Sequence, residues 1–156
     1  MADLHPDIAP LGFLLGTWRG SGTGVYPTIE DFAYDEEVTI GHMGKPFLRY
    51  EQRTKRAGTG DPLHTEVGYW RAAGDRAELV IAQPTGVTEA LAGPIDGTSV
   101  ALASVQIGLA PTAKEVVTTE RRITVDGNTM HYTLLMGAVG QPHQLHLDAT
   151  LTRIAE

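Results

Sequence analysis

The stretch LGTWRGSGTGVYPTI, residues 15–29, places four glycines within nine residues around a single tryptophan, Trp18. The glycines are Gly16, Gly20, Gly22 and Gly24. Because glycine costs conformational entropy and offers no side chain to pack, several glycines in one strand indicate a sharp bend, a bulge or the close approach of another group. We therefore expect a strongly coiled strand, with Trp18 plugging one end of the fold or packing under a short helix.

The remainder of the chain predicts strand after strand, separated by turns that contain glycine. Candidate strands cover 34–43, 46–55, 63–72, 76–83, 87–93, 98–107, 114–125, 129–139 and 144–154. Ala73-Gly74-Asp75, Asp96-Gly97-Thr98 and Asp126-Gly127-Asn128 tolerate the positive φ of tight turns. With the glycine-rich segment there are about ten strands, which predicts an all-β fold, a single antiparallel up-and-down barrel. Residues 6–16 predict a short N-terminal helix, and a barrel of this size can enclose a ligand cavity.

Length and composition limit the classes of function. The 156 residues fit one domain over 1–156, and no apolar run approaches the ~20 residues that span a bilayer. No basic and apolar leader is visible at the start, so we expect a cytoplasmic protein. The absence of cysteine excludes disulfides, thiolate metal sites and covalently attached haem. A net charge of −7 disfavours nucleic acid and anionic membranes, and favours a small-molecule partner.

Six histidines are the main candidates for chemistry, and none forms a zinc-binding pattern. His143 and His146 are three residues apart, which places them on opposite faces of a strand, and Glu36 and Glu37 diverge in the same way. GSGTG lacks the ending of a phosphate-binding loop, and there is no nucleophile motif. A lone histidine is usually a surface or hydrogen-bonded residue, but in a barrel mouth it can also bind a haem iron. The residues alone do not choose between these interpretations.

Several segments resemble the nitrobindin family, and they stand in the family's order along nearly the whole chain. The signature GxWxGxG lies at 16–22, although lipocalin-like barrels also begin with GxW. The other matching segments are YPTI (26–29), GKPFLRY (44–50), LHTEVGYWR (63–71), GLAPTAKEV (108–116) and AVGQPHQLHLDATL (138–151).

The resemblance implies a ten-stranded barrel similar to fatty-acid-binding proteins, with non-covalent, mainly ferric haem b at one open end. It also implies isomerisation of peroxynitrite to nitrate, and reversible binding of nitric oxide by the ferrous form. Carried over by position, His146 would be the proximal iron ligand and the catalytic residue. His64 would lie on the distal side without bonding the iron. Thr28 and Lys114 would contact the haem, and a lysine suits its propionates.

The last strand leaves the identity of the inward-facing histidine open. Its apolar residues share one parity: Leu145, Leu147, Ala149 and Leu151. Simple alternation would turn these residues inward and His146 outward, whereas His143 shares the parity of the leucines. Alternation therefore favours His143, and the resemblance favours His146.

Two further functions remain open at this point. A non-catalytic barrel could carry a fatty acid or another apolar ligand, and since Arg121 and Arg122 are adjacent, one of them could face inward to hold a carboxylate. A haem carrier or nitric oxide sensor without isomerase activity is the other alternative. A homodimer would cover apolar outer faces of the barrel, and the sequence leaves that assembly open.

Overall fold

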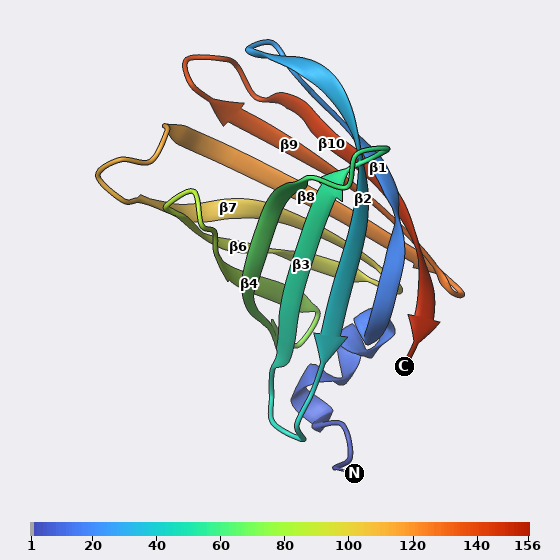
Figure 1. Ribbon diagram of the computed structural model, residues 1–156. Coiled ribbons are helices and arrows are strands. Elements are labelled where there is room, and N and C mark those ends of the chain that lie inside the picture. The colour runs from blue at the N-terminus through green and yellow to red at the C-terminus, as the bar shows by residue number, and fades with distance from the viewer. Residues whose placement is uncertain (1) are drawn as a thin grey trace.

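The computed structural model describes residues 2–156 and is a closed antiparallel barrel of ten strands preceded by a 3₁₀ helix, η1 (Figure 1). Helix η1 spans Pro6–Leu14. The strands are β1 (Gly16–Tyr26), β2 (Ile29–Gly41), β3 (Leu48–Arg56), β4 (Pro62–Ala73), β5 (Arg76–Ala82), β6 (Val87–Asp96), β7 (Ser99–Leu109), β8 (Val116–Asp126), β9 (Thr129–Ala138) and β10 (Gln144–Ala155). Each strand pairs with the next, and β1 closes the barrel against β10. The predicted fold class is therefore confirmed.

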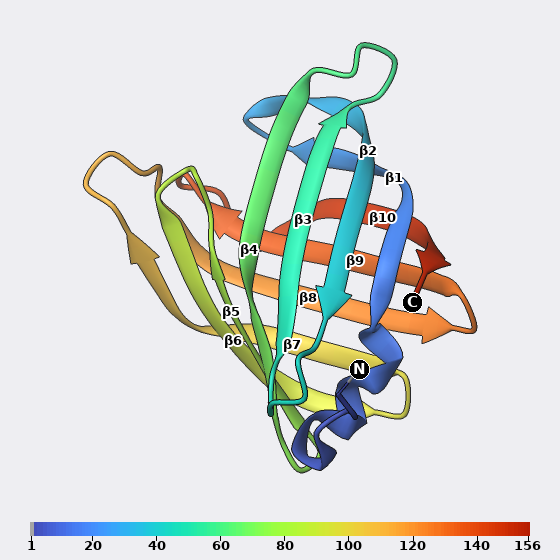
Figure 2. The ribbon, with the colours of Figure 1, turned by 60° about the horizontal axis from the view of Figure 1, so that its bottom comes forward.

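Glycine turns set several of these boundaries, as expected. Gly74, Gly97 and Gly127 have φ values of 62°, 59° and 59° in the turns after β4, β6 and β8. The main difference is at β2, which begins at Ile29 rather than at residue 34. Figure 2 shows β2–β4 running steeply across β7–β10, with η1 at the lower end. This crossing reflects the strong coiling that a small closed barrel requires.

The glycines of β1 clear the interior of the barrel. Gly20, Gly22 and Gly24 alternate with exposed residues and lie on the inward side of β1, between buried Trp18 and Tyr26. A Cβ atom on Gly22 would lie 2.6 Å from the Tyr34 ring. One on Gly24 would meet the ring of Phe32, and one on Gly20 would meet the backbone of β10. The missing side chains allow β2 aromatic rings and the β10 backbone to approach β1 closely.

We expect Gly20→Ala to lower the free energy of unfolding by about 1–3 kcal/mol, because the added methyl group overlaps backbone atoms that cannot rotate away. Urea denaturation of the purified chain measures this change. Gly41→Ala is the matched control, since a Cβ at Gly41 meets nothing within 4 Å. Equal stability of the two variants would contradict the close-approach explanation.

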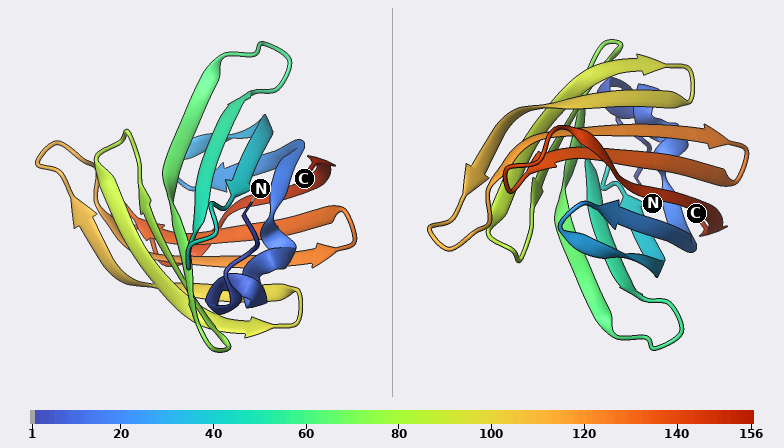
Figure 3. Two further views of the ribbon diagram at one scale, coloured as in Figure 1. Left: turned by 90° about the horizontal axis from the view of Figure 1, so that it is seen from below. Right: turned by 90° about the horizontal axis from the view of Figure 1, so that it is seen from above.

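Helix η1 closes one end of the barrel. Its side chains of Ile8, Leu11 and Leu14 are fully buried, and Trp18 donates from Nε1 to the Leu14 carbonyl at 3.0 Å. Figure 3 shows η1 across this end in the view from below. The position of Trp18 under the helix is thus confirmed. In residues 2–156 no helix has the length and hydropathy to cross a bilayer.

Candidate functional site

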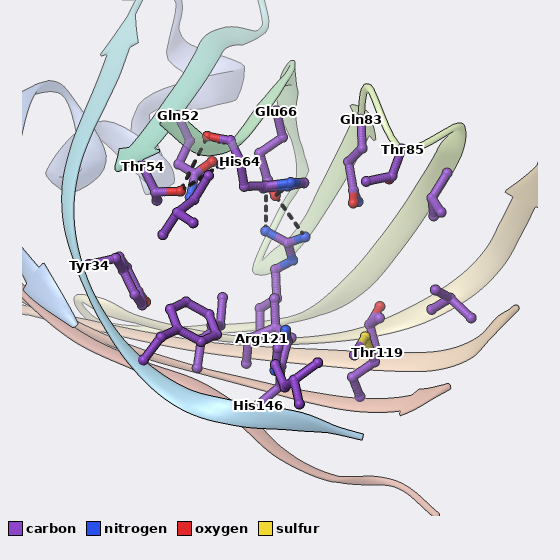
Figure 4. Close-up of a pocket in the computed structure, with 18 of the residues that line it drawn as sticks. Tyr34, Gln52, Thr54, His64, Glu66, Gln83, Thr85, Thr119, Arg121 and His146 are labelled. Atoms are coloured by element: carbon purple, nitrogen blue, oxygen red, sulfur yellow. Dashed lines mark hydrogen bonds and ion pairs between the residues drawn. The ribbon is translucent and has the colours of Figure 1, made fainter. Parts of the chain in front are cut away.

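The opposite end of the barrel holds a cavity of about 760 Å³. Residues from several strands line it, and Figure 4 labels some of them. Its apolar lining includes Ile29, Phe32, Leu63, Val87, Val116, Leu134, Met136 and Leu147. Its polar lining includes Tyr34, Gln52, Thr54, Arg56, His64, Glu66, Gln83, Thr85, Glu89, Thr119, Arg121 and His146. A volume in the range of known ligand sites, with apolar side chains and convergent polar groups in the same walls, is typical of a small-molecule site.

His146 lines this cavity because β10 contains a bulge where the histidine stands. The register to β9 shifts between Leu145 and Leu147, which pair with the adjacent residues Leu135 and Leu134. The extra residue reverses the alternation before the bulge, so Leu145 is exposed while Ala149 and Leu151 stay buried.

The alternation argument that favoured His143 as the inward-facing histidine is wrong for this physical reason. His143 precedes β10 and is directed to the outer side of β8. Its Nδ1 lies 2.8 Å from Oγ1 of Thr118, and its Nε2 lies 3.3 Å from Oε1 of Glu120. Both partners alternate with Thr119 and Arg121, which face the cavity.

The backbone selects one protonation form of the His146 ring. Nδ1 lies 3.0 Å from the Val25 carbonyl oxygen, which can only accept, so Nδ1 carries the hydrogen. Burial lowers the pKa of His146, which favours the neutral ring. Tyr26 packs edge-on against it, with ring centroids 5.4 Å apart. Nε2 makes no hydrogen bond or ion pair within residues 2–156, so its lone pair is available to a ligand in the cavity.

A buried ionic cluster forms the polar wall of the cavity. Arg121 of β8 donates to Glu66 of β4 at 2.6 Å (Figure 4). It also donates to Glu89 of β6 at 3.0 Å. Burial acts to raise the pKa of Glu66, but the charge of Arg121, aided by His64, holds it at about 2. His64 lies in the wall with Nε2 3.3 Å from Oε1 of Glu66. Glu89 also accepts from Thr119.

A third buried carboxyl group, Glu36, lies deeper in the barrel among neutral hydrogen-bond partners. It accepts from Tyr132 at 2.7 Å and from Gln52 at 2.8 Å. Burial raises the pKa of Glu36 to about 7, with Glu66 adding to the rise, and Tyr132, Gln52 and Arg121 opposing it. The expectation that Glu36 and Glu37 diverge is confirmed, because Glu37 lies outside and pairs with Arg19.

We expect Glu36→Gln to gain stability relative to the wild type as the pH rises. The folded state binds a proton at Glu36 between the ordinary pKa of 4.5 and about 7, so the ionised carboxyl group destabilises the fold above this window. The difference should grow from near zero at about pH 4 to as much as about 3 kcal/mol at about pH 8. Urea denaturation of both proteins at each pH gives this difference, in which the contributions of the other titrating groups cancel. A difference that does not change with pH would contradict the raised pKa of Glu36.

A small inner chamber of about 40 Å³ lies between this cluster and the core. Three of its lining residues carry buried polar atoms that find no partner in the described part of the chain: Oε1 of Gln52, Nε1 of Trp70 and Nε of Arg121. Two donors and one acceptor around a space large enough for a water molecule form a site for ordered water.

The remaining expected site residues lie at the open end without lining the cavity. Thr28 is exposed in the turn between β1 and β2, and Lys114 is exposed in the loop between β7 and β8. Each lies within two residues of a lining residue, Ile29 and Val116 respectively. Of the four residues carried over from the resemblance, the cavity brings together only His146 and His64.

Sequence reasoning missed several polar residues of the cavity. Arg56 lines its mouth and lies over the Phe32 ring, 6.0 Å from the centroid. Glu66 and Glu89 are the partners of Arg121. Isolated charged residues at inward positions of apolar strands could have indicated this cluster, but their pairing depends on which strands face each other across the barrel. Among residues 2–156 no three potential metal-ligating side chains come together.

Comparison with known proteins gives consistent results. A family model described as "THAP4-like, heme-binding beta-barrel domain" matches residues 7–153. The chain is 51% identical to Peroxynitrite isomerase 2 of Mycobacterium avium, covering 97% of each sequence. It is 50% identical to Peroxynitrite isomerase of Nocardia farcinica, over 96% of this chain and 92% of that protein. The crystal structure of Rv2717c from M. tuberculosis superposes with a TM-score of 0.91 at 47% identity, covering 97% of this chain and 99% of that one.

Proposed function

Because the chain belongs to the THAP4-like haem-binding β-barrel family, the nitrobindin family, we propose that it is a haem-dependent peroxynitrite isomerase in which His146 would hold the haem iron. The observation that carries this proposal is the imidazole of His146 at the wall of the large cavity, with Nδ1 bonded to the backbone and Nε2 without a partner among residues 2–156. A histidine that donates from one nitrogen to a carbonyl is the usual arrangement for metal ligation through the other.

The cavity residues fit haem b. The volume of about 760 Å³ and the apolar walls suit a flat, largely apolar macrocycle. Arg56 lies at the mouth, and Lys114 and Thr28 stand in the loops of the same end, so they are the residues that would hold the propionates. The carboxylates of Glu66 and Glu89 repel the propionates only weakly, because Arg121 pairs with both and offsets their charge.

In this proposal each residue has a definite task. Ferric haem, when bound there, would supply Lewis-acid chemistry toward the peroxynitrite anion. Val25 fixes the His146 ring and increases the basicity of Nε2 through its carbonyl group. Phe32, Leu63 and Met136 exclude water from the walls. His64 places a polar ring in the same cavity, where Glu66 fixes its orientation, so that it tunes polarity for an anionic substrate.

The alternative of a fatty-acid carrier receives less support from the structure. Arg121 does face the interior, as that alternative requires, but its guanidinium group already pairs with Glu66 and Glu89. A fatty-acid carboxylate would have to displace a buried carboxylate. Nitric oxide binding by the ferrous protein, a homodimer and a cytoplasmic location remain predictions.

We expect the purified chain to bind added hemin at one equivalent with a sharp Soret band. The haem-loaded chain should then accelerate peroxynitrite decay in stopped-flow measurements and increase the nitrate share of the products, measured by ion chromatography. Haem-free chain and free hemin at the same concentrations are the controls. If the loaded chain acts no faster than free hemin, the isomerase proposal is wrong and a carrier or sensor function takes its place.

A further inference from the structure

Two tyrosines connect the large cavity to the buried carboxyl group of Glu36. Tyr34 lines the cavity (Figure 4), and its hydroxyl oxygen lies 2.8 Å from that of Tyr132. When Glu36 is ionised, it can only accept, so Tyr132 donates its own hydrogen to Oε1 of Glu36 at 2.7 Å and Tyr34 is the donor between the two phenols. The result is a directed chain of hydrogen bonds from the cavity wall to a buried carboxyl group.

The barrel contains a second buried tyrosine–glutamate pair, which differs in its charge environment. Tyr50 donates to Oε2 of Glu66 at 2.9 Å, but the same oxygen accepts from Arg121 at 2.6 Å. Ion pairing makes the Glu66 carboxylate a weak base. Within residues 2–156 Glu36 has Tyr132 and Gln52 as its hydrogen-bond partners, and it is the far better proton acceptor of the two glutamates.

Burial prevents the simpler route to phenol oxidation, in which the phenol first loses its proton to solvent and then loses an electron. It raises the pKa of both Tyr34 and Tyr132, so neither phenol can lose its proton to solvent before it loses an electron. Oxidation must therefore be accompanied by proton transfer along existing hydrogen bonds. Tyr34 has such a path through Tyr132 to Glu36. Tyr26, which packs on His146, donates only to the Met136 and Ala138 carbonyl groups, which cannot accept a proton.

We propose that Tyr34 and Tyr132 form a redox-active pair that reduces one-electron oxidants in the cavity, with Glu36 as the proton acceptor. The inference rests on the proposed function, because the oxidant is nitrogen dioxide, which forms when the O–O bond of peroxynitrite breaks into radicals that escape recombination. Nitrogen dioxide takes one electron from Tyr34 and becomes nitrite. The Tyr34 proton moves to the Tyr132 oxygen, and the Tyr132 proton moves to Glu36, which leaves a neutral Tyr34 phenoxyl radical.

The same chemistry makes Tyr34 a modification site. A second nitrogen dioxide radical combines with the Tyr34 phenoxyl radical, and the displaced ring hydrogen returns to the oxygen, which gives 3-nitrotyrosine. Tyr34 is only 1% exposed, whereas Tyr69 on the outer face is 49% exposed. Random attack from solvent would therefore mark Tyr69, and directed chemistry in the cavity would mark Tyr34.

The first test uses the haem-loaded chain treated with peroxynitrite, followed by peptide mass spectrometry of each tyrosine and by freeze-quench electron paramagnetic resonance. We expect a tyrosyl radical and nitration at Tyr34. Tyr34→Phe should lose the radical, and Glu36→Gln should lose most of it, because an amide keeps a hydrogen bond but cannot take the proton. Tyr50→Phe, which removes the other buried pair, should keep the wild-type signal.

A second test separates this inference from the isomerase proposal. Pulse radiolysis of nitrite solution delivers nitrogen dioxide to the haem-free chain without peroxynitrite, and the Soret titration is recorded on the same preparation. Nitration of Tyr34 above Tyr50, reduced by Glu36→Gln, would support the pair even if the loaded chain proved inactive. Equal nitration of Tyr34 and Tyr50, or no effect of Glu36→Gln in a variant of normal thermal stability, would overturn it.

Discussion

Replacing His146 with alanine should abolish the sharp Soret band that added hemin gives with the wild-type chain. The methyl group of alanine offers no ligand, and among residues 2–156 the other cavity histidine, His64, is held at Nε2 by Glu66. The absorption titration should change from one saturable equivalent to the weak, broad signal of hemin on an apolar surface. Peroxynitrite isomerisation should fall with it to the rate of free hemin.

His143→Ala is the matched control for this variant. It removes a histidine only three residues away that bonds to Thr118 and Glu120 on the outer side of the barrel. We expect its Soret band and its hemin affinity to equal those of the wild type. If His143→Ala loses the band and His146→Ala keeps it, the proposed ligand is wrong and the bulge in β10 does not have the role argued above.

Arg121→Met should have the largest effect on stability, with a loss of about 3–5 kcal/mol in the free energy of unfolding. The methionine fills much of the same volume, but it leaves the buried carboxylates of Glu66 and Glu89 without their cation. Urea denaturation at neutral pH measures the loss. Part of it should disappear in acid, because protonation removes the charges left unpaired.

Arg122→Met tests whether this loss depends on burial. Its guanidinium group pairs with Glu120, but the side chain is 63% exposed, so water screens the interaction. We expect a change of no more than about 1 kcal/mol. A similar loss in both variants would show that the inner cluster contributes no more than a surface ion pair.

The sequence was sufficient for the fold because its signals are local. Gly74, Gly97 and Gly127 mark turns, and the alternation in β9 correctly places Met130, Tyr132 and Leu134 inside. The outcome was different where one residue breaks the alternation. No residue around His146 predicts a bulge from the sequence, because the register shift depends on how β10 pairs with β9. The family resemblance selected His146 when the alternation did not.

The ionic cluster was beyond sequence reasoning for another reason. Arg121 belongs to β8, Glu66 to β4 and Glu89 to β6. Along the chain, the two glutamates lie 55 and 32 positions from Arg121. Alternation can predict that each faces inward, but not that three strands bring them to one depth. The exposed places of Thr28 and Lys114 likewise depend on loop conformations, for which the sequence holds no periodic signal.

Because η1 closes one end of the barrel, the two ends of the molecule differ in how freely their residues can change during evolution. The tryptophans and most of the packed leucines gather toward η1, whereas the cavity residues stand on strand ends at the far side. Substitutions at the cavity mouth can therefore change ligand binding without weakening the packed core at η1 that stabilises the fold. A related protein could therefore bind a different ligand through substitutions at the cavity mouth alone, while GTWRGSG and helix η1 stay unchanged.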